Sequence, residues 1–102
     1  MKIRTVNGKE IGRQKFRLYI VNETPRSLLA GANLNKMCEE YFEDRCDIEV
    51  VDLQQEPQLA KKDQILSIPT LIRISPKLEK RIIGDLSDTR RVLAVLGLKT
   101  EA

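Results

Sequence analysis

The sequence predicts an α/β protein with a mixed central sheet and the element order βαβ–α–ββα. Two apolar, β-branched stretches, residues 15–21 and 47–53, flank one amphipathic helix, and parallel strands need such a crossover connection. Two further strand-like stretches, residues 70–74 and 78–83, are separated by a short Ser–Pro–Lys turn that returns the chain antiparallel. A sheet that holds both a parallel and an antiparallel pair follows from these observations.

Length and composition indicate one compact domain. The 102 residues are 41% hydrophobic and 32% charged, and an aromatic share of 4% leaves the core to Leu, Ile and Val. No run approaches the roughly 18 apolar residues of a membrane span, and the N-terminus lacks the apolar centre of a signal peptide. We therefore expect no membrane contact and a cytoplasmic protein.

Residues 1–14 are expected to be an N-terminal extension of a domain at residues 15–102. Asn7–Gly8 allows either a small hairpin or a frayed arm there.

The charges fall in blocks, although the net charge is only +3. Residues 1–17 and 73–91 are mainly basic, whereas residues 39–63 are mainly acidic, and such blocks can steer a charged partner. Neither aromatic–basic interleaving nor a glycine-rich phosphate loop is present in the sequence. Nucleic acid is therefore not expected as a partner.

The residues that carry chemistry in other proteins are sparse here. Asp52, Glu56 and Asp63 could suggest a metal site, but their spacing matches no Ca²⁺ or Mg²⁺ loop. The two cysteines, Cys38 and Cys46, form no C-x-x-C pair, and the lack of histidine excludes a Cys–His nucleophile pair. We expect Cys38 to be a buried helix residue and Cys46 a reduced loop thiol, with no catalytic residue, metal or cofactor.

The first half of the domain has strong secondary-structure signals. Residues 15–21 have few polar breaks, as expected for a strand buried on both faces. Thr24 can cap the helix that follows, and Pro25 suits its first position. The helix carries an apolar stripe at spacings of three and four residues. The members of this stripe are Ala30, Leu34, Met37, Cys38 and Tyr41.

The second half is patterned more weakly. A second helix is expected from Pro57, with apolar points at Leu59, Ala60, Ile65 and Leu66. Pro69 stands where the strand at residues 70–74 begins, and because proline cannot donate a ladder hydrogen bond, a special turn or a cis peptide bond is expected. Gly84–Asp85 makes a turn, and Ser87 or Asp88 caps the last helix. That helix presents Val92, Leu93, Val95 and Leu96 to the core.

Two features of this order together resemble the thioredoxin-like fold. The first strand reaches a helix N-terminus through Thr24–Pro25, and Ile68–Pro69–Thr70 later opens an antiparallel hairpin. In that fold family the proline is cis and faces a redox motif at the helix N-terminus. Residues 22–27 hold no cysteine here, so disulfide exchange has no nucleophile at that position. The resemblance implies the fold without the thioredoxin activity.

A longer resemblance is to the KaiB family of circadian-clock proteins. It runs over about residues 16–96, in the ordered segments LYIVNETP, DLQQEPQLAKKDQILSIPTL and KRIIGDLSD. The resemblance implies a non-catalytic binding module for a ring-shaped hexameric ATPase of the KaiC type. It also implies a thioredoxin-like fold in the partner-bound state. For the isolated chain it implies a homo-oligomer, a dimer or tetramer, in which the half from Pro57 onward packs differently.

The segment with the closest resemblance supplies the expected partner-binding residues. They are Lys80, Arg81, Asp85, Ser87 and Asp88, with Arg73 added from the preceding strand. The alternative is that Asp85 and Ser87 serve the turn and the helix cap, and that Arg73 is solvated surface. Pro69, Pro76 and Gly84 are expected to determine the fold, either in one fixed packing or in a choice between two.

Departures from the better-known clock members limit the resemblance. Val95 and Gly97 stand where those members have a Gly and an Asp near the end of the last helix. Asp47 and Glu49 make the second strand acidic, where those members place small and basic residues that meet KaiA. This difference argues against recruitment of a KaiA-like partner.

Three functions remain open from the sequence. The leading one is a non-catalytic adaptor that binds a KaiC-type ATPase and modulates its activity or phosphorylation state, in circadian or stress-response regulation. The alternative is a thioredoxin-like oxidoreductase that uses Cys38 or Cys46. The third is a sensor-type module, since clock histidine kinases carry KaiB-like domains at their N-termini.

Overall fold

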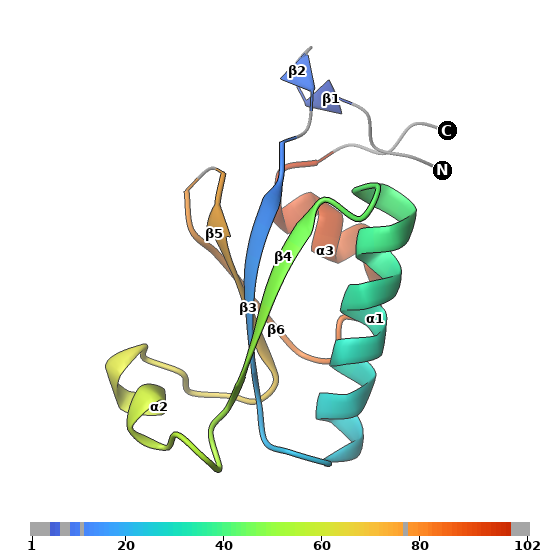
Figure 1. Ribbon diagram of the computed structural model, residues 1–102. Helices are drawn as coiled ribbons and strands as arrows, with labels where there is room; N and C mark the ends of the chain where they lie inside the picture. The colour runs from blue at the N-terminus through green and yellow to red at the C-terminus, as the bar shows by residue number, and fades with distance from the viewer. Residues whose placement is uncertain (1–4, 7–8, 11, 77, 99–102) are drawn as a thin grey trace.

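A four-stranded mixed sheet forms the centre of the protein (Figure 1). The computed structural model describes residues 5–6, 9–10, 12–76 and 78–98. The strands lie in the order β4-β3-β5-β6 and are β3 (Gln14–Ile20), β4 (Cys46–Asp52), β5 (Thr70–Ser75) and β6 (Lys80–Ile83). β3 and β4 are parallel, whereas β5 is antiparallel to both β3 and β6. The predicted parallel and antiparallel pairs are confirmed.

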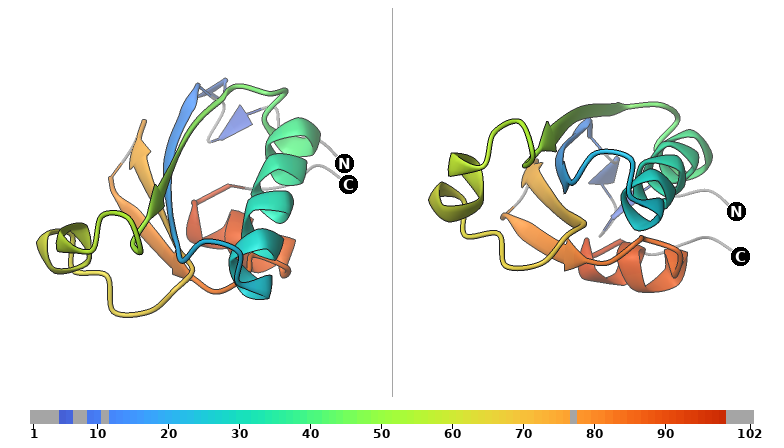
Figure 2. Two further views of the ribbon diagram at one scale, coloured as in Figure 1. Left: turned by 60° about the horizontal axis from the view of Figure 1, so that its bottom comes forward. Right: turned by 90° about the horizontal axis from the view of Figure 1, so that it is seen from below.

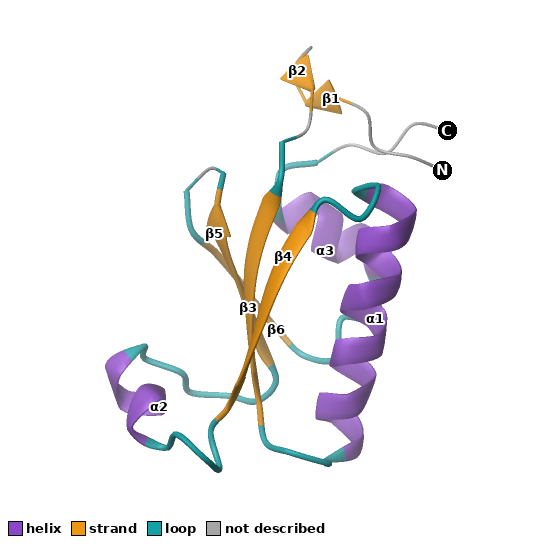
Figure 3. Ribbon diagram, viewed as in Figure 1, coloured by secondary structure: helices purple, strands orange, loops and turns teal. Residues whose placement is uncertain are grey.

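The helices cover the two faces of the sheet unequally (Figure 2). On one face lie α1 (Pro25–Tyr41) and α3 (Thr89–Val95), and among the described residues the other face carries only the short α2 (Gln58–Lys62), as Figure 3 also shows. The start of α1 is as predicted, because the Thr24 side chain accepts a hydrogen bond from the Ser27 amide at 3.3 Å. Pro25 occupies the first turn, where its missing N–H costs nothing.

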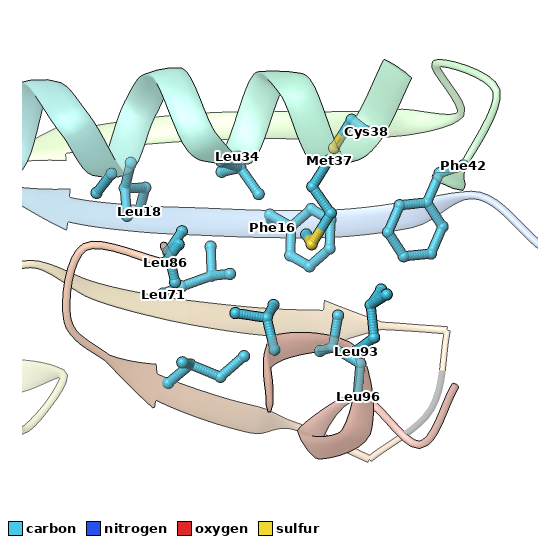
Figure 4. Close-up of a cluster of buried hydrophobic side chains, with 13 residues drawn as sticks. Phe16, Leu18, Leu34, Met37, Cys38, Phe42, Leu71, Leu86, Leu93 and Leu96 are labelled. Carbon is cyan, nitrogen blue, oxygen red and sulfur yellow. The ribbon is translucent and has the colours of Figure 1, made fainter. Parts of the chain in front are cut away.

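The main hydrophobic core fills the space between the sheet and the helices α1 and α3 (Figure 4). Its buried members are Phe16, Leu18, Ala30, Leu34, Met37, Cys38, Phe42, Leu71, Ile82, Leu86, Val92, Leu93 and Leu96. The rings of Phe16 and Phe42 pack edge to face, with centroids 6.2 Å apart. The predicted stripe of α1 is confirmed, although its last member, Tyr41, is only half-buried.

A smaller apolar cluster lies on the opposite face of the sheet, beside α2. Its buried members are Tyr19, Val51, Leu53, Ile65 and Ile72. The Tyr19 hydroxyl donates to the carboxylate of Asp63 at 2.5 Å. Arg81 donates to the backbone carbonyls of Asp63 and Gln64 at 2.9 and 3.0 Å. These bonds hold the segment that follows α2 against the sheet, and Tyr19 itself is fully buried.

Two short strands near the N-terminus pair with each other. β1 (Thr5–Val6) pairs antiparallel with β2 (Lys9–Glu10), so the first of the two alternatives for this region is confirmed. The expected turn at Asn7–Gly8 lies outside the described residues.

A cis proline stands at each end of β5. The peptide bonds Ile68–Pro69, before the strand, and Ser75–Pro76, after it, are both cis. The Pro69 carbonyl accepts the Gly84 amide at 3.0 Å, which joins the end of β6 to the start of β5. Gly84 has a φ of 119°, a conformation that favours glycine and fits the turn expected there.

The prediction that Leu66 is an apolar contact of the second helix is wrong. Helix α2 ends at Lys62, and Gln64 adopts a positive φ of 57°, so the helical periodicity does not extend to Leu66. Ile65 is buried in the smaller cluster, whereas Leu66 points outward with 95% of its surface exposed.

The prediction that Arg73 lies on the surface is also wrong, because only 2% of the residue is exposed. Its position on β5 places it on the same face as Leu71, toward the main core. Its guanidinium donates to the carbonyls of Leu78 (3.1 Å) and Leu96 (3.5 Å) and to the Gln14 side chain (3.5 Å). Burial lowers the pKa of this guanidinium, and its Nε has no partner among the described residues. Arg73 therefore joins the β5–β6 hairpin to the end of α3 and is not available to a partner.

Candidate functional site

Three connecting segments meet at the lower end of the sheet in Figure 1. They are the turn between β3 and α1, the segment that leads into β5, and the loop between β6 and α3. The Gly84–Pro69 hydrogen bond joins the last two, and a Cβ on Gly84 would lie 3.8 Å from a guanidinium nitrogen of Arg26 in the first turn of α1. We call residues 21–26, 66–69 and 84–88 the loop edge.

An apolar groove of about 520 Å³ lies where residues 21 and 66–68 of the loop edge meet α2 and the segments that flank it. Its lining consists of Val21, Leu53, Gln54, Pro57, Ala60, Ile65, Leu66, Ser67 and Ile68. The exposed side chain of Leu66 stands at this groove, so the groove and the leucine form one continuous apolar surface. Continuous apolar surface of this kind is typical of an interaction site, whereas isolated exposed leucines are ordinary.

A smaller and more polar hollow of about 200 Å³ lies at residues 84–88 of the loop edge, next to the N-terminus of α3. Charged residues of both signs line it, namely Arg26, Asp85, Asp88 and Arg91. The Asp85 carboxylate accepts the Ser87 amide at 2.9 Å, and the Asp85 carbonyl accepts the Asn33 side chain at 2.8 Å. Three of the predicted site residues, Asp85, Ser87 and Asp88, therefore lie together at the loop edge.

The Ser87 hydrogen bonds give Asp85 a pH-dependent role. The Ser87 side chain first, and its amide second, lower the pKa of Asp85 from the ordinary 3.8. A carboxylate with a lowered pKa stabilises the folded state above its ordinary pKa, and this contribution is lost as the pH falls through the lowered value. We expect Asp85→Asn to reduce stability in urea titrations at about pH 6 and to make no difference once the pH is well below 3.8. Identical pH profiles for the two proteins would contradict this role.

Asp88 has a local role as the N-cap of α3. Its side chain accepts the Arg91 amide at 3.2 Å, which satisfies one free donor of the first turn. We expect Asp88→Ala to lower the free energy of unfolding by about 1 kcal/mol, and Asp88→Asn to change it little, because asparagine caps equally well. Urea titration measures both values. A loss of equal size in the two variants would show that the cap is not the source of the effect.

Lys80 and Arg81 lie at the opposite end of β6 from Asp85. Lys80 is exposed, and Arg81 pairs with Glu79 at 3.3 Å in addition to its bonds to the segment after α2. Arg81 thus holds the chain just before Ile65 and Leu66. The predicted residues do not form one cluster. Arg73 and Lys80 are not at the loop edge, whereas Leu66 and Arg26, which were not predicted, are.

The apolar groove was not predicted from the sequence. The run Ile65–Leu66–Ser67–Ile68 is the signal that could have indicated it. This mainly apolar run stands directly before a proline, and since proline is typical of the first residue of a strand, the run lies in the connection that leads to that strand. Its alternating exposure, with Ile65 buried and Leu66 exposed, depends on where α2 ends, and the sequence pattern does not fix that residue.

Both cysteines lie far from the loop edge, near the C-terminal end of α1. Cys38 is in the last turn of the helix, and Cys46 is the first residue of β4, so the prediction of Cys46 in a loop is wrong. Both thiols are free. The N-terminus of α1, which carries the redox motif in the thioredoxin-like fold, presents Thr24 and Pro25 here.

Within residues 5–6, 9–10, 12–76 and 78–98, no group of three or more His, Cys, Asp or Glu side chains is arranged to hold a metal ion. In the same ranges, no helix has the length and hydropathy that crossing a membrane requires.

The fold matches solved thioredoxin-like structures at low sequence identity. Mitochondrial thioredoxin 3 from Saccharomyces cerevisiae superposes with a TM-score of 0.64 over 83% of this chain and 78% of that one, at 14% identity. The N-terminal domain of Synechococcus elongatus SasA superposes with a TM-score of 0.63 over 90% of each chain, at 17% identity. These similarities establish an α/β thioredoxin-like fold, as the sequence predicted.

Sequence comparison gives the family. The KaiB domain matches residues 17–98. The circadian clock oscillator protein KaiB of Prochlorococcus marinus (strain MIT 9211) is 44% identical over 86 residues, which are 84% of this chain and 75% of that protein. The circadian clock protein KaiB3 of Synechocystis sp. (strain ATCC 27184 / PCC 6803 / Kazusa) is 38% identical over 92 residues, 90% of each chain. The chain therefore belongs to the KaiB family and is a homologue of circadian clock proteins.

Proposed function

We propose that this chain is a non-catalytic docking module that binds a KaiC-type hexameric ATPase through its loop edge. Binding would modulate the activity or phosphorylation state of that ATPase in the cytoplasm, in a circadian or stress response. Membership of the KaiB family supports the class of partner. The single observation that carries the choice of surface is Leu66, whose side chain is 95% exposed beside an apolar groove.

The composition of the loop edge suits a protein partner. An apolar centre with a polar rim is the usual anatomy of an interface, and the groove around Leu66 supplies the apolar part. Arg26, Asp85 and Ser87 supply charge and hydrogen-bonding groups at the rim, where complementary charges set the rate and orientation of binding. We retain Asp85, Ser87 and Asp88 as contact residues, and assign Arg81 to support of the segment before Leu66.

The geometry does not favour the alternative of a thioredoxin-like oxidoreductase. A redox-active thiol in this fold lies at the N-terminus of α1, where the helix end stabilises the thiolate. Cys38 is buried at the other end of that helix, and its interaction with the Cys46 thiol, followed by burial, raises the pKa of Cys46. A thiol with a raised pKa is a poor nucleophile at neutral pH.

We also propose that the isolated chain forms a homo-oligomer, a dimer or tetramer, in which the half from Pro57 onward takes a second packing. The support comes from the segment around α2, which is the part of this half that little structure holds against the sheet. Helix α2 has only five residues, none of them buried, and Leu66 next to it is almost fully exposed. Two packings within a few kcal/mol of each other are then accessible to a partner or an oligomer interface.

We propose no KaiA-like partner for the edge of the sheet at β4. Asp47 and Glu49 on this strand form ion pairs with Arg13 and Arg17.

Size-exclusion chromatography with light scattering tests the proposed docking. The chain is mixed with a KaiC-type ATPase that has been assembled into hexamers with ATP. We expect a peak heavier than the hexamer that contains both proteins and ATP hydrolysis that differs from the hexamer alone. Separate elution at tens of micromolar of each protein would contradict the proposed function.

A further inference from the structure

Helix α2 lies apart from the other helices and has little packing of its own to fix its position (Figure 1). It has five residues, none of them buried, and a helix this short is not stable by itself in water. Backbone bonds close the turn that follows it, from the Asp63 amide to the Leu59 carbonyl at 2.9 Å and from the Ile65 amide to the Ala60 carbonyl at 2.8 Å. Apart from the burial of Ile65, polar contacts with the sheet have to hold this segment in place.

Those polar contacts meet at Asp63. Its carboxylate accepts the hydroxyl of Tyr19 on β3 at 2.5 Å, and its backbone carbonyl accepts the guanidinium of Arg81 on β6 at 2.9 Å. The same guanidinium donates to the Gln64 carbonyl at 3.0 Å. Two strands that β5 separates in the sheet therefore hold one residue, through its side chain and through its main chain.

The other neighbour of the Tyr19 hydroxyl fixes the direction of its bond to Asp63. Arg17 donates to the Tyr19 oxygen at 3.5 Å, and a guanidinium can only donate. The hydroxyl hydrogen is thus free for the Asp63 carboxylate, and a hydrogen bond to a carboxylate is stronger than one between neutral groups. Burial, followed by the bond to Asp63, raises the pKa of Tyr19, so the hydroxyl keeps its hydrogen at neutral pH.

We propose that Asp63 is a positioning residue for docking, because its bonds to the sheet hold Leu66, three residues further along the chain, in one orientation at the apolar groove. A side chain that samples several orientations binds more weakly, by the fraction of time that it spends in the competent one. The affinity for the partner would then depend on Asp63 although this residue acts only through Leu66. This inference rests on the proposed function, since it concerns the surface that docks.

Hydrogen–deuterium exchange of the free full chain is the first test, because it needs no partner. Tyr19→Phe removes the hydroxyl and keeps the ring. We expect the Ile65 amide to exchange about 10-fold faster in this variant, which is the factor for the loss of one hydrogen bond to a charged group. Tyr41→Phe is the matched control, since it makes the same change on α1, and it should leave the exchange of Ile65 unaltered.

Binding to the assembled KaiC-type hexamer, measured by surface plasmon resonance, is the second test. Tyr19→Phe and Asp63→Ala should each weaken binding about 10-fold. Asp63→Asn should weaken it less, because the amide oxygen can still accept the Tyr19 hydroxyl. In a chain that already carries Leu66→Ala, Tyr19→Phe should weaken binding no further, whereas a merely structural role predicts the same loss with and without the leucine.

Two results would overturn the proposal. One is unaltered exchange of the Ile65 amide in Tyr19→Phe, and the other is an equal loss of binding in the presence and absence of the Leu66 side chain. Failure of the unaltered chain to bind the hexamer would instead contradict the proposed function, and exchange in the free chain would still decide whether Asp63 restrains the segment. Because Tyr19 is buried, Asp63→Ala supplies the same exchange measurement if Tyr19→Phe fails to fold.

Discussion

A Leu66→Asp variant is expected to bind the KaiC-type ATPase at least about 30-fold more weakly than the unaltered chain. The central apolar residue of an interface is often worth about 2 kcal/mol or more, and 2 kcal/mol corresponds to about that factor. A buried carboxylate in place of the leucine adds a desolvation cost in the complex. Titration calorimetry or surface plasmon resonance with the assembled hexamer measures the effect.

Leu78→Asp is the matched control for this prediction. Leu78 is also highly exposed, at 82%, but it lies in the connection between β5 and β6, away from the loop edge. Both variants should melt at the temperature of the unaltered chain, because neither side chain packs in the core. If Leu78→Asp weakens binding as much as Leu66→Asp, the loss comes from added negative charge, and the loop edge is not the docking surface.

A Phe16→Ala variant should lose about 3–5 kcal/mol of unfolding free energy. Phe16 is fully buried at the centre of the main core, and its ring packs against Phe42. Removal of the ring leaves a cavity between the sheet and α1 that the surrounding side chains only partly fill. Since domains of this size have a total stability of about 5–15 kcal/mol, the variant should be near the limit of folding.

Val50→Ala provides the comparison for Phe16→Ala. Val50 lies on β4 with 54% of its surface exposed, so its truncation should cost about 1 kcal/mol or less. Urea titrations followed by circular dichroism give both values. A cost for Phe16→Ala as small as that for Val50→Ala would mean that the main core is not as described.

The first half of the fold was predictable because its signals are local and agree with one another. The cap at Thr24, the proline after it and the apolar stripe of α1 all indicate the same helix boundaries. The crossover rule then fixes the parallel pairing of β3 and β4, which the register confirms. The strand bounds differ from prediction by one residue.

The errors in the second half come from long-range contacts. Arginine is rarely buried, so a surface position for Arg73 was the reasonable expectation. Its burial depends on the carbonyls of Leu78 and Leu96, which reach it from other elements. Leu66 was misplaced because α2 ends before the apolar pattern does.

The candidate site was predictable only in its local parts. Asp85 and Asp88 have the turn and cap contacts that their positions indicated. The apolar groove required tertiary structure, since it joins segments whose approach depends on the positive φ of Gln64. No sequence pattern marks Gln64 for that conformation, because non-glycine residues rarely adopt it.

Hydrogen–deuterium exchange of the chain, free and bound to the assembled KaiC-type hexamer, tests the proposed docking most directly. Amides of residues 66–68 and 84–88 should exchange more slowly in the complex. Those of the β5–β6 connection and of the free edge of β4 should be unchanged. Protection confined to β4 or to that connection, or no protection anywhere, would contradict docking through the loop edge.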